Sequence, residues 1–537
     1  MKTRLRIAAL LTAAALPLAA CGDDFLTEKP ADFVAPENFY QNAADAVAAV
    51  NAAYASFINP GGGIGSSDYM GRNLWMILEY PTEVVTSRLS ANNERSWIDN
   101  YHFNFTPAHP YLLGIWRAAY AGINRANAVI ARAPDVPMDE GRKAQLIGEA
   151  KFLRALHYYY LAGLFGGVPL SLDETREISS EGKPRATAAE TWEQIETDLT
   201  EAAAALPTSW SGSDYGRATK GAALFLLAKA QMQSISQTGN SAKWSEAVNT
   251  LAQVRGLGYT LDPNYASLFD GSNERSSEIV FSIQNIRVSG AGGRFTEWFV
   301  PFLTGLYSSV QNQFQAEREF YDSYDATDVR KAGTWLTSYT RPDGQEVSWS
   351  WTPGIEVPYA STGPSVRKYI DLNAGGGGAE EPDVVLLRYA DVLLSSAEAI
   401  NEVSGPTAEA YGYVNQVRAR AKIASLTPGL SKDAFRDSVY VERRHELAME
   451  GHGLLDNRRN WTWSKARLDA SMVNNGTGTG GKNRSPFTSS TRKNYAGQVP
   501  MEEKWKLYPV PHAACEVNDQ LTQNPGWPVG ACAGGGS

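Results

Sequence analysis

The sequence of 537 residues predicts a mainly α-helical fold, in which about four helical hairpins form a scaffold that irregular, partly β insertions interrupt. Three observations lead to this prediction. Apolar residues recur at alternating steps of three and four, which is the spacing of an amphipathic helix. Two pairs of helical segments share a pattern of small residues. Stretches rich in Gly, Ser, Asn, Pro and aromatic residues, which are typical of loops, separate the helical segments.

The N-terminus is typical of an export signal. Three basic residues within positions 2–6 precede an apolar run at 7–18, which is shorter than the ~20 residues of a membrane-spanning helix. Small residues then precede Cys21, as in a bacterial lipoprotein signal. The sequence therefore predicts a signal peptide at 1–20 and a lipid on Cys21 that anchors the mature chain to a membrane. The alternative is an ordinary secretion signal followed by a cysteine by chance.

Four helical segments come first. Residues 38–57 are rich in Ala and stop at an Asn-Pro-Gly turn, and residues 111–132 stop before a proline. Residues 139–165 end at Gly-Gly-Val-Pro, and a capping box at Thr187 opens a fourth helix that Pro207 ends. The apolar stripe of the third helix contains Leu146, Ala150, Leu153, His157, Tyr160 and Leu164.

Two later helix pairs resemble each other. Residues 222–255 contain AALFLLAKA, a turn and AVNTLAQVR, and residues 391–418 contain DVLLSSAEA, a turn and AYGYVNQVR. Small residues allow antiparallel helices to approach closely, so the repeated pattern predicts stacked hairpins of the tetratricopeptide type. With the earlier segments, eight helices make about four pairs, and one further helix is expected at about 431–450.

Three stretches lack helical periodicity, and we expect them to be insertions in a single domain at 21–537. The scaffold covers about 38–256 and 384–456, and the insertions cover about 60–110, 257–383 and 460–537. Long irregular insertions on a regular scaffold are usual places for binding.

The second insertion contains a predicted β-hairpin. The RPDG sequence at 341–344 has the composition of a tight turn. Alternate residues of the flanking segments would lie on one face of each strand. These are Trp335, Thr337 and Tyr339 before the turn and Val347, Trp349 and Trp351 after it.

The charge balance narrows the classes of function. The chain has 49 Lys and Arg against 58 Asp and Glu, a net charge of −9. This balance argues against binding to nucleic acid or to anionic lipid. No G-x-S-x-G motif occurs. The sequence leaves open the carboxylate pair of a glycoside hydrolase, because tertiary structure sets its separation of about 5–10 Å.

Two partial motifs lead us to expect neither a metal nor another cofactor. The His-Glu pair at His445 begins like the zinc motif H-E-x-x-H, but Met449 replaces the second His, and His452 is too far along the helix. Residues 476–482 resemble a phosphate-binding loop. Asn483 stands where a Ser or Thr would bind magnesium, and no buried strand precedes the loop.

The chain has three cysteines. With a lipid on Cys21, Cys515 and Cys532 are left near the C-terminus. We expect them to form a disulfide in an oxidising compartment, and two free thiols are the alternative.

The stretch ERRHELAMEGHGLLDNRR at 442–459 is densely charged. Arg443 lies three residues before Glu446 and seven before Glu450, which predicts ion pairs along one helix face. Gly451 can end the helix, so that the charged residues after it fold back. We expect a partly buried ion network that ties the last helix to the repeats.

Several blocks, in order along the chain, resemble the SusD/RagB family of outer-membrane nutrient-binding lipoproteins. CGDDFL at 21–26 resembles the mature start of such proteins, and its acidic residues resemble a surface-export signal. The other blocks are GEAKFLRALHYYYLAGLFGGVPL at 148–170, LLRYADVLLSSAEAINEV at 386–403, ERRHELAMEGHGLLDNRR at 442–459 and KLYPVPHAACEVNDQLTQNPGW at 506–527, with short matches at 328–331 and 367–369. Gly453 and Leu454 stand where larger residues are commoner, and Asn457 replaces a usual Leu, which would soften the packing there.

The resemblance implies a lipoprotein at the cell surface, anchored in the outer membrane by Cys21. Such a protein captures oligosaccharides or related nutrients and delivers them to a SusC-like TonB-dependent transporter, without being an enzyme. The sequence leaves two other classes of protein as alternatives. One is a tetratricopeptide-type scaffold for protein interactions, and the other is a secreted glycoside hydrolase.

A sugar site should combine aromatic rings, which pack against C–H faces, with polar side chains that bind hydroxyls. Two sets of residues in the insertions fit this description, and the alternative for each Trp is burial in a core. The first set is Arg88, Asn92, Asn93, Trp97 and Tyr101, and the second is Trp298, Tyr307, Trp335, Trp349 and Trp351.

Overall fold

The computed structural model describes ten ranges of the chain. They are residues 39–58, 69–87, 106–176, 182–288, 292–300, 314–341, 343–348, 364–373, 379–467 and 502–533. Within these ranges the fold is the expected helical scaffold with irregular, partly β insertions. No helix in them is both long and apolar enough to cross a membrane.

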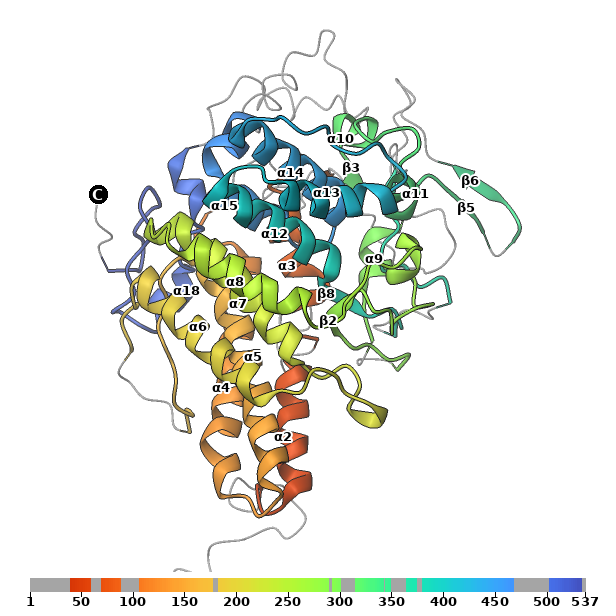
Figure 1. Cartoon of the computed structure of the whole chain (residues 1–537). Helices are drawn as coiled ribbons and strands as arrows, with labels where there is room; N and C mark the ends of the chain where they lie inside the picture. Colours follow the sequence, from red (N-terminus) through yellow and green to blue (C-terminus); the bar gives the residue numbers. More distant parts are fainter. Residues whose placement is uncertain are drawn as a thin grey trace, which may run out of the picture.

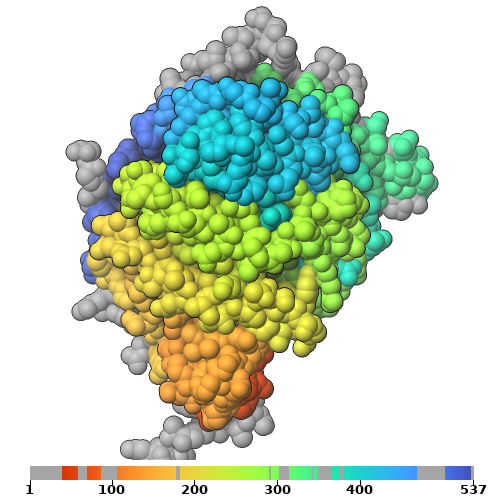
Figure 2. Space-filling view, in the orientation of Figure 1, coloured from red at the N-terminus to blue at the C-terminus, as the bar shows by residue number. Residues whose placement is uncertain are grey.

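The helices stack in chain order. The first six are α2 (Ala43–Ala55), α4 (Pro110–Arg132), α5 (Glu140–Phe165), α6 (Ala188–Ala205), α7 (Lys220–Thr238) and α8 (Lys243–Arg255). Helix α2 packs on α4, and each helix from α4 to α7 packs on the next one. Figure 2 shows this order as successive bands of colour across one face of the molecule.

The stack continues across the long second insertion. Helix α12 (Tyr389–Ser404) packs on α8, and both α13 (Ala408–Arg420) and α14 (Lys432–Leu447) pack on α12 (Figure 1). The nine helices that the sequence predicts are confirmed, and most of their ends lie within a few residues of the predicted ones. The capping box at Thr187 is also present. Helix α14 ends at Leu447, three residues earlier than expected, and Gly451 follows with a positive φ of 77°.

A buried helix lies inside what the sequence suggested was an irregular insertion at 60–110. A short π-helix at Tyr69–Asn73 leads into α3 (Leu74–Glu79), in which every side chain is buried. The sequence does not predict this helix, because Leu74–Leu78 are all apolar and give no amphipathic period. Helix α15 (Gly453–Arg459), which packs on α3, was also not expected as a helix.

The β structure is divided between small sheets. The predicted hairpin is confirmed as β5 (Ser338–Thr340) and β6 (Glu346–Ser348), with Tyr339 opposite Val347, and it projects from the body in Figure 1. Trp335 was expected in the same hairpin, but it lies in a different sheet. The four strands of that sheet, in the order β1-β3-β7-β4, are β1 (Val85–Ser87), β3 (Phe314–Ala316), β7 (Ser365–Val366) and β4 (Trp335–Leu336).

The remaining elements are short. Strands β2 (Ile279–Ile283) and β8 (Val384–Arg388) pair antiparallel, and β8 runs directly into α12. The short helices are α9 (Phe295–Phe299), α10 (Arg318–Asp322), α11 (Val329–Thr334) and α18 (His512–Cys515). A disulfide joins Cys515 at the end of α18 to Cys532.

Gly453 allows α15 to approach α3 closely. A Cβ atom at Gly453 would lie 2.7 Å from Thr82 Cγ2, 3.1 Å from Glu79 Oε2 and 3.4 Å from the Leu78 carbonyl oxygen. The packing at this position is therefore tight, and the expectation that Gly453 softens it was wrong. The absence of a side chain is what permits the contact.

Gly453→Ala should lower the free energy of unfolding by about 1–3 kcal/mol, because the added methyl group overpacks this contact. Gly412→Ala in α13 is the matched control. Its Cβ would meet nothing within 4 Å, so it should be neutral or stabilise by about 0.5–1 kcal/mol through helix propensity. Urea unfolding of both variants measures the difference, and equal stabilities would contradict the tight contact.

Candidate functional site

Most of the predicted ligand-binding residues lie outside the described ranges. These are Arg88, Asn92, Asn93, Trp97, Tyr101, Tyr307, Trp349 and Trp351. The lipidation site Cys21 and the glycine-rich loop at 476–482 also lie outside them. The roles of these residues stay predictions.

Trp298 and Trp335 are described, and both are buried. Trp335 is 2% exposed and packs edge-on against Phe320. Trp298 is 4% exposed, with the guanidinium of Arg72 4.7 Å from its ring centroid and that of Arg294 5.5 Å away. For these two tryptophans the structure favours a core position over an open sugar platform.

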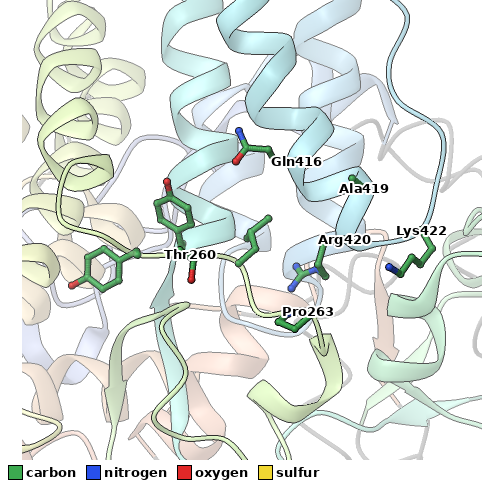
Figure 3. Close-up of a pocket in the computed structure, with 9 residues that line it drawn as sticks. Thr260, Pro263, Gln416, Ala419, Arg420 and Lys422 are labelled. Carbon is green, nitrogen blue, oxygen red and sulfur yellow. The ribbon is translucent and has the colours of Figure 1, made fainter.

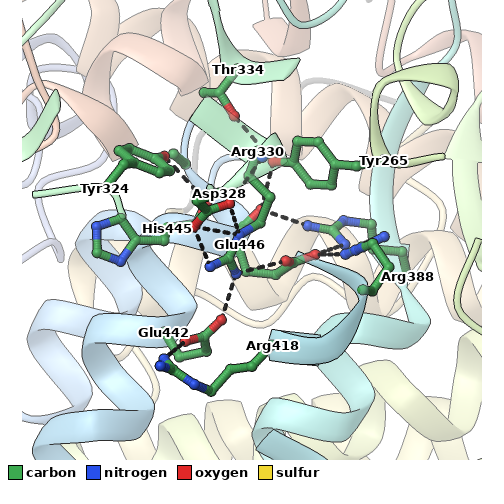
Figure 4. Close-up of polar contacts among 12 residues, drawn as sticks. Tyr265, Tyr324, Asp328, Arg330, Thr334, Arg388, Arg418, Glu442, His445 and Glu446 are labelled. Atoms are coloured by element: carbon green, nitrogen blue, oxygen red, sulfur yellow. Dashed lines mark hydrogen bonds and ion pairs between the residues drawn. The ribbon is translucent and has the colours of Figure 1, made fainter. Parts of the chain in front are cut away.

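The charged stretch at 442–459 forms the centre of a buried ion network (Figure 4). Glu446 is fully buried on α14. Its Oε1 accepts hydrogen bonds from Arg388 Nη1 at 2.6 Å and from Arg420 Nη2, and its Oε2 accepts one from Arg330 Nη1 at 3.0 Å. These three arginines come from β8, α13 and α11, so one carboxylate connects three other elements to α14.

Two more carboxylates extend the network. Glu450 pairs with Arg388 Nε and with Lys368 Nζ, both at 2.6 Å. Glu278 lies directly before β2 and pairs with Arg388 at 2.8 Å and with Arg420 at 3.1 Å. The network therefore joins the second insertion to the helical stack.

The ion pairs differ from those expected along the helix face. Arg443 pairs with Asp391 of α12 at 2.6 Å and with Asp456 of α15 at 2.8 Å, and not with Glu446 or Glu450. The expectation that the chain folds back after the Gly451 turn is confirmed by the contact of Asp456. The centre of the network is buried, since the side chains of Arg443 and Asp391 are at most 1% exposed, and its edge is partly exposed, with Arg418 at 21%.

Charge pairing outweighs burial at Glu446. Burial alone would raise the pKa of this carboxyl, but the charges of Arg420, Arg388 and Arg330 hold its pKa well below the usual range. The carboxylate therefore stays ionised at any physiological pH. Pairs of this kind fix geometry more reliably than they add net stability, but losing one partner leaves uncompensated buried charges.

The two histidines of the stretch have structural contacts. His445 stacks on Phe320, and its Nε2 lies 2.8 Å from Ser323 Oγ. His452 Nδ1 lies 3.4 Å from Lys229 Nζ. Burial lowers the pKa of both imidazoles to about 4. Among the described residues, no group of three or more His, Cys, Asp or Glu is placed to hold a metal ion.

A pocket of about 460 Å³ lies on the helical scaffold, beside the network (Figure 3). The loop after α8, the start of α12 and the end of α13 form its walls. Tyr259, Tyr389, Gln416, Arg420 and Lys422 are among its lining residues. None of the five was predicted as a site residue, because the loop that contains Tyr259 is far in sequence from Tyr389 and from the end of α13.

Glu446→Ala should lower the free energy of unfolding by about 3–5 kcal/mol, because three buried guanidiniums lose a shared partner. Asp433→Ala on the same helix is the matched control. The side chain of Asp433 is 84% exposed and pairs with Arg436, and such pairs contribute at most about 1 kcal/mol. Thermal and chemical unfolding test this, and ligand affinity should be unchanged in both variants. A Glu446→Ala protein of normal stability that loses ligand binding would contradict the structural role.

Glu79 should make the free energy of unfolding fall as the pH rises. A carboxyl with a lowered pKa, such as that of Glu446, has the opposite effect. Its Oε1 accepts a hydrogen bond from Gly451 N at 2.7 Å, and burial raises its pKa to about 8. A glutamate in the unfolded chain has a pKa of about 4.3. As pH rises, the unfolded state ionises first, so the contribution of Glu79 to stability is fully present below about pH 4.3 and is lost toward pH 8.

Glu79→Gln keeps an acceptor for Gly451 but does not titrate. The free energy of unfolding of the wild type, relative to this variant, should fall by more than about 1.4 kcal/mol between pH 5 and 8, which is the equivalent of one pKa unit. Urea unfolding at several pH values measures the difference. A difference that stays constant over this range would show that Glu79 is ionised throughout.

Comparison with known proteins places the chain in one family. Two family models match, one described as "SusD family" over residues 225–527 and one as "Starch-binding associating with outer membrane" over residues 37–232. The SusD-like protein P2 of Formosa agariphila is 29% identical over 462 residues, which cover 81% of this chain and 86% of that protein.

Solved structures share the fold. A SusD homolog from Bacteroides thetaiotaomicron superposes with a TM-score of 0.77 at 23% identity, covering 91% of this chain and 98% of the homolog. Surface glycan-binding protein A from the same species, solved in complex with laminarihexaose, gives a TM-score of 0.70 at 20% identity and covers 90% of this chain and 99% of that protein. Since the first family model spans more than half of the 537 residues, the chain belongs to the SusD family.

Proposed function

We propose that this protein captures oligosaccharides at the cell surface and delivers them to a SusC-like TonB-dependent transporter in the outer membrane. The observation that carries the proposal is the match to the SusD family over residues 225–527, together with the match to a second model, described as starch-binding, over residues 37–232. The laminarihexaose complex of a structural neighbour supports a glycan as the ligand.

Anchoring by a lipid is the second part of the proposal. The apolar run at 7–18 and the small residues before Cys21 support cleavage of a signal peptide after residue 20. A lipid on Cys21 would hold the mature chain at the outer membrane, and the acidic residues at 23 and 24 support its export to the cell surface. We propose that the protein binds its ligand without hydrolysing it.

The register of the four-stranded sheet is evidence that two insertions together form a single binding surface. In the register of β1 and β3, Ser87 lies opposite Phe314. Arg88 follows Ser87 directly in the chain, and Tyr307 precedes Phe314 by seven residues. The segment that contains Trp97 and the segment that contains Tyr307 are therefore tethered at the same end of one strand pair.

Buried aromatic rings pack against Phe314, at this end of the pair of strands β1 and β3. The ring of Phe299 on α9 packs edge-on against Phe314, and that of Tyr80 lies 4.5 Å from it. Trp298 precedes Phe299 on α9 and is buried, with the guanidinium of Arg72 over its ring. We infer that these buried rings support the insertions and that the binding aromatics lie among Trp97, Tyr101, Tyr307, Trp349 and Trp351, with Arg88 and Asn93 as polar partners.

A glycan array with the full-length protein tests the proposed capture, and calorimetry with a glycan that binds tests the site. Trp97→Ala should weaken affinity at least about tenfold, or about 1.4 kcal/mol, because stacking on an aromatic ring is lost. Trp244→Ala, a partly buried tryptophan of the scaffold helix α8, is the control and should leave affinity unchanged. An array without any bound glycan would refute the proposed function, whereas unchanged affinity of Trp97→Ala would remove only that residue from the site. Release of shorter products from a bound glycan would contradict the non-enzymatic role.

A further inference from the structure

The pocket on the helical scaffold has the composition of a ligand site. It lies where the end of α13 meets the loop after α8, and none of its lining residues belongs to the sheet that tethers the predicted binding insertions. Figure 3 shows Thr260 and Pro263 on that loop, facing Gln416, Ala419 and Arg420 of α13. Its volume of about 460 Å³ falls within the 300–1,000 Å³ range of small-molecule sites.

Two tyrosines provide an aromatic wall. The rings of Tyr259 and Tyr389 lie 6.3 Å apart with an angle of 29° between their planes, and both are partly exposed. Partial burial raises the pKa of both phenols, so their hydroxyls stay protonated and able to donate. The hydroxyl of Tyr389 forms no hydrogen bond with any described residue. The Tyr259 hydroxyl lies 3.3 Å from Thr219 Oγ1, so this wall combines two ring faces for C–H groups with one donor, the Tyr389 hydroxyl.

Arg420 lines another wall of the pocket and is held in place by the ion network. It is 7% exposed, and its two terminal nitrogens bind Glu278, the Asp262 carbonyl oxygen and Glu446. Its Nε is buried and has no hydrogen-bond partner within the described part of the chain. The ion network therefore fixes the guanidinium of Arg420 in the wall of the pocket, and the buried Nε is not exposed to a ligand.

Lys422 supplies the uncompensated charge of the pocket. None of the described residues that line the pocket is acidic, and the charge of Arg420 is already balanced by Glu278 and Glu446. The ammonium group of Lys422 has no ion pair or hydrogen bond with a described residue. Its backbone is held in the left-handed region at a φ of 65°, and its carbonyl oxygen accepts from Thr327 Oγ1 at 2.9 Å. Strained backbone of this kind is often found at functional sites.

We propose that this pocket binds an acidic saccharide, a unit of uronic acid within an oligosaccharide. One sugar ring packs against Tyr259 and Tyr389, and the carboxylate pairs with Lys422. The inference rests on the proposed capture of glycans and names their chemical class. In a chain with a net charge of −9, a pocket with the uncompensated charge of Lys422 and without a lining acid favours an anionic ligand.

Calorimetry with the full-length protein tests the inference. The probes are tetrasaccharides of galacturonate, glucuronate and mannuronate, each with the neutral tetrasaccharide of the same linkage. At least one acidic probe should bind more tightly than its neutral counterpart. Lys422→Gln should weaken its binding at least tenfold and leave binding of the neutral counterpart unchanged, while Tyr389→Ala should weaken both.

Lys432→Gln on α14 is the matched control, because Lys432 is exposed and pairs with Glu402 outside the pocket. Thermal melts check that all three variants are folded. If no acidic probe binds, or if one binds with an affinity that Lys422→Gln and Tyr389→Ala leave unchanged, the inference is overturned. A different result would refute the proposed function itself, namely a glycan array on which no saccharide binds, whether acidic or neutral.

Discussion

The carboxylate of Glu446 is a charge placed where water does not solvate it, and the fold around it follows from the need to neutralise that charge. An isolated ion in such a place costs several kcal/mol, so it must have partners with good geometry. Three guanidiniums provide them, from β8, α13 and α11. Each guanidinium in turn has another acid to satisfy, so that Glu278, Glu442 and Glu450 are fixed as well. Helix α14 has one position in which all of these pairs form, and this sets how the second insertion docks on the helical stack.

This arrangement separates support from recognition. The buried pairs and the close contact of Gly453 with α3 hold the scaffold, while the residues proposed to touch ligand lie on insertions tethered to the sheet or on the surface of the stack. Arg420 belongs to both parts, because its terminal nitrogens bind Glu278 and Glu446 and the residue also lines the pocket. A ligand at the pocket would therefore contact a side chain whose orientation the network has already fixed, which lowers the entropy lost on binding.

The sequence predicts the helical scaffold well, because amphipathic spacing, capping residues and prolines are local signals. It does not reveal α3, whose side chains are buried on every face, nor the break after Leu336 that moves Trp335 into another sheet. The charged stretch at 442–459 was expected to be a network, but its partners were not, since Arg330 and Arg388 lie more than 50 residues away. For the same reason, nothing in the sequence brings Tyr259 and Tyr389 together, and local pattern cannot tell that Trp298 is buried.

The central claim is that Glu446 and its arginines act as one coupled unit that holds the second insertion on the stack. A double-mutant cycle with Glu446→Gln, Arg388→Met and the double variant measures this most directly, by urea unfolding at neutral pH. Residues of one ion network typically show coupling energies of about 0.5–3 kcal/mol, and the buried geometry predicts a value of at least about 1 kcal/mol. Effects that add to within about 0.5 kcal/mol would mean that the two residues act independently, and would contradict the claim.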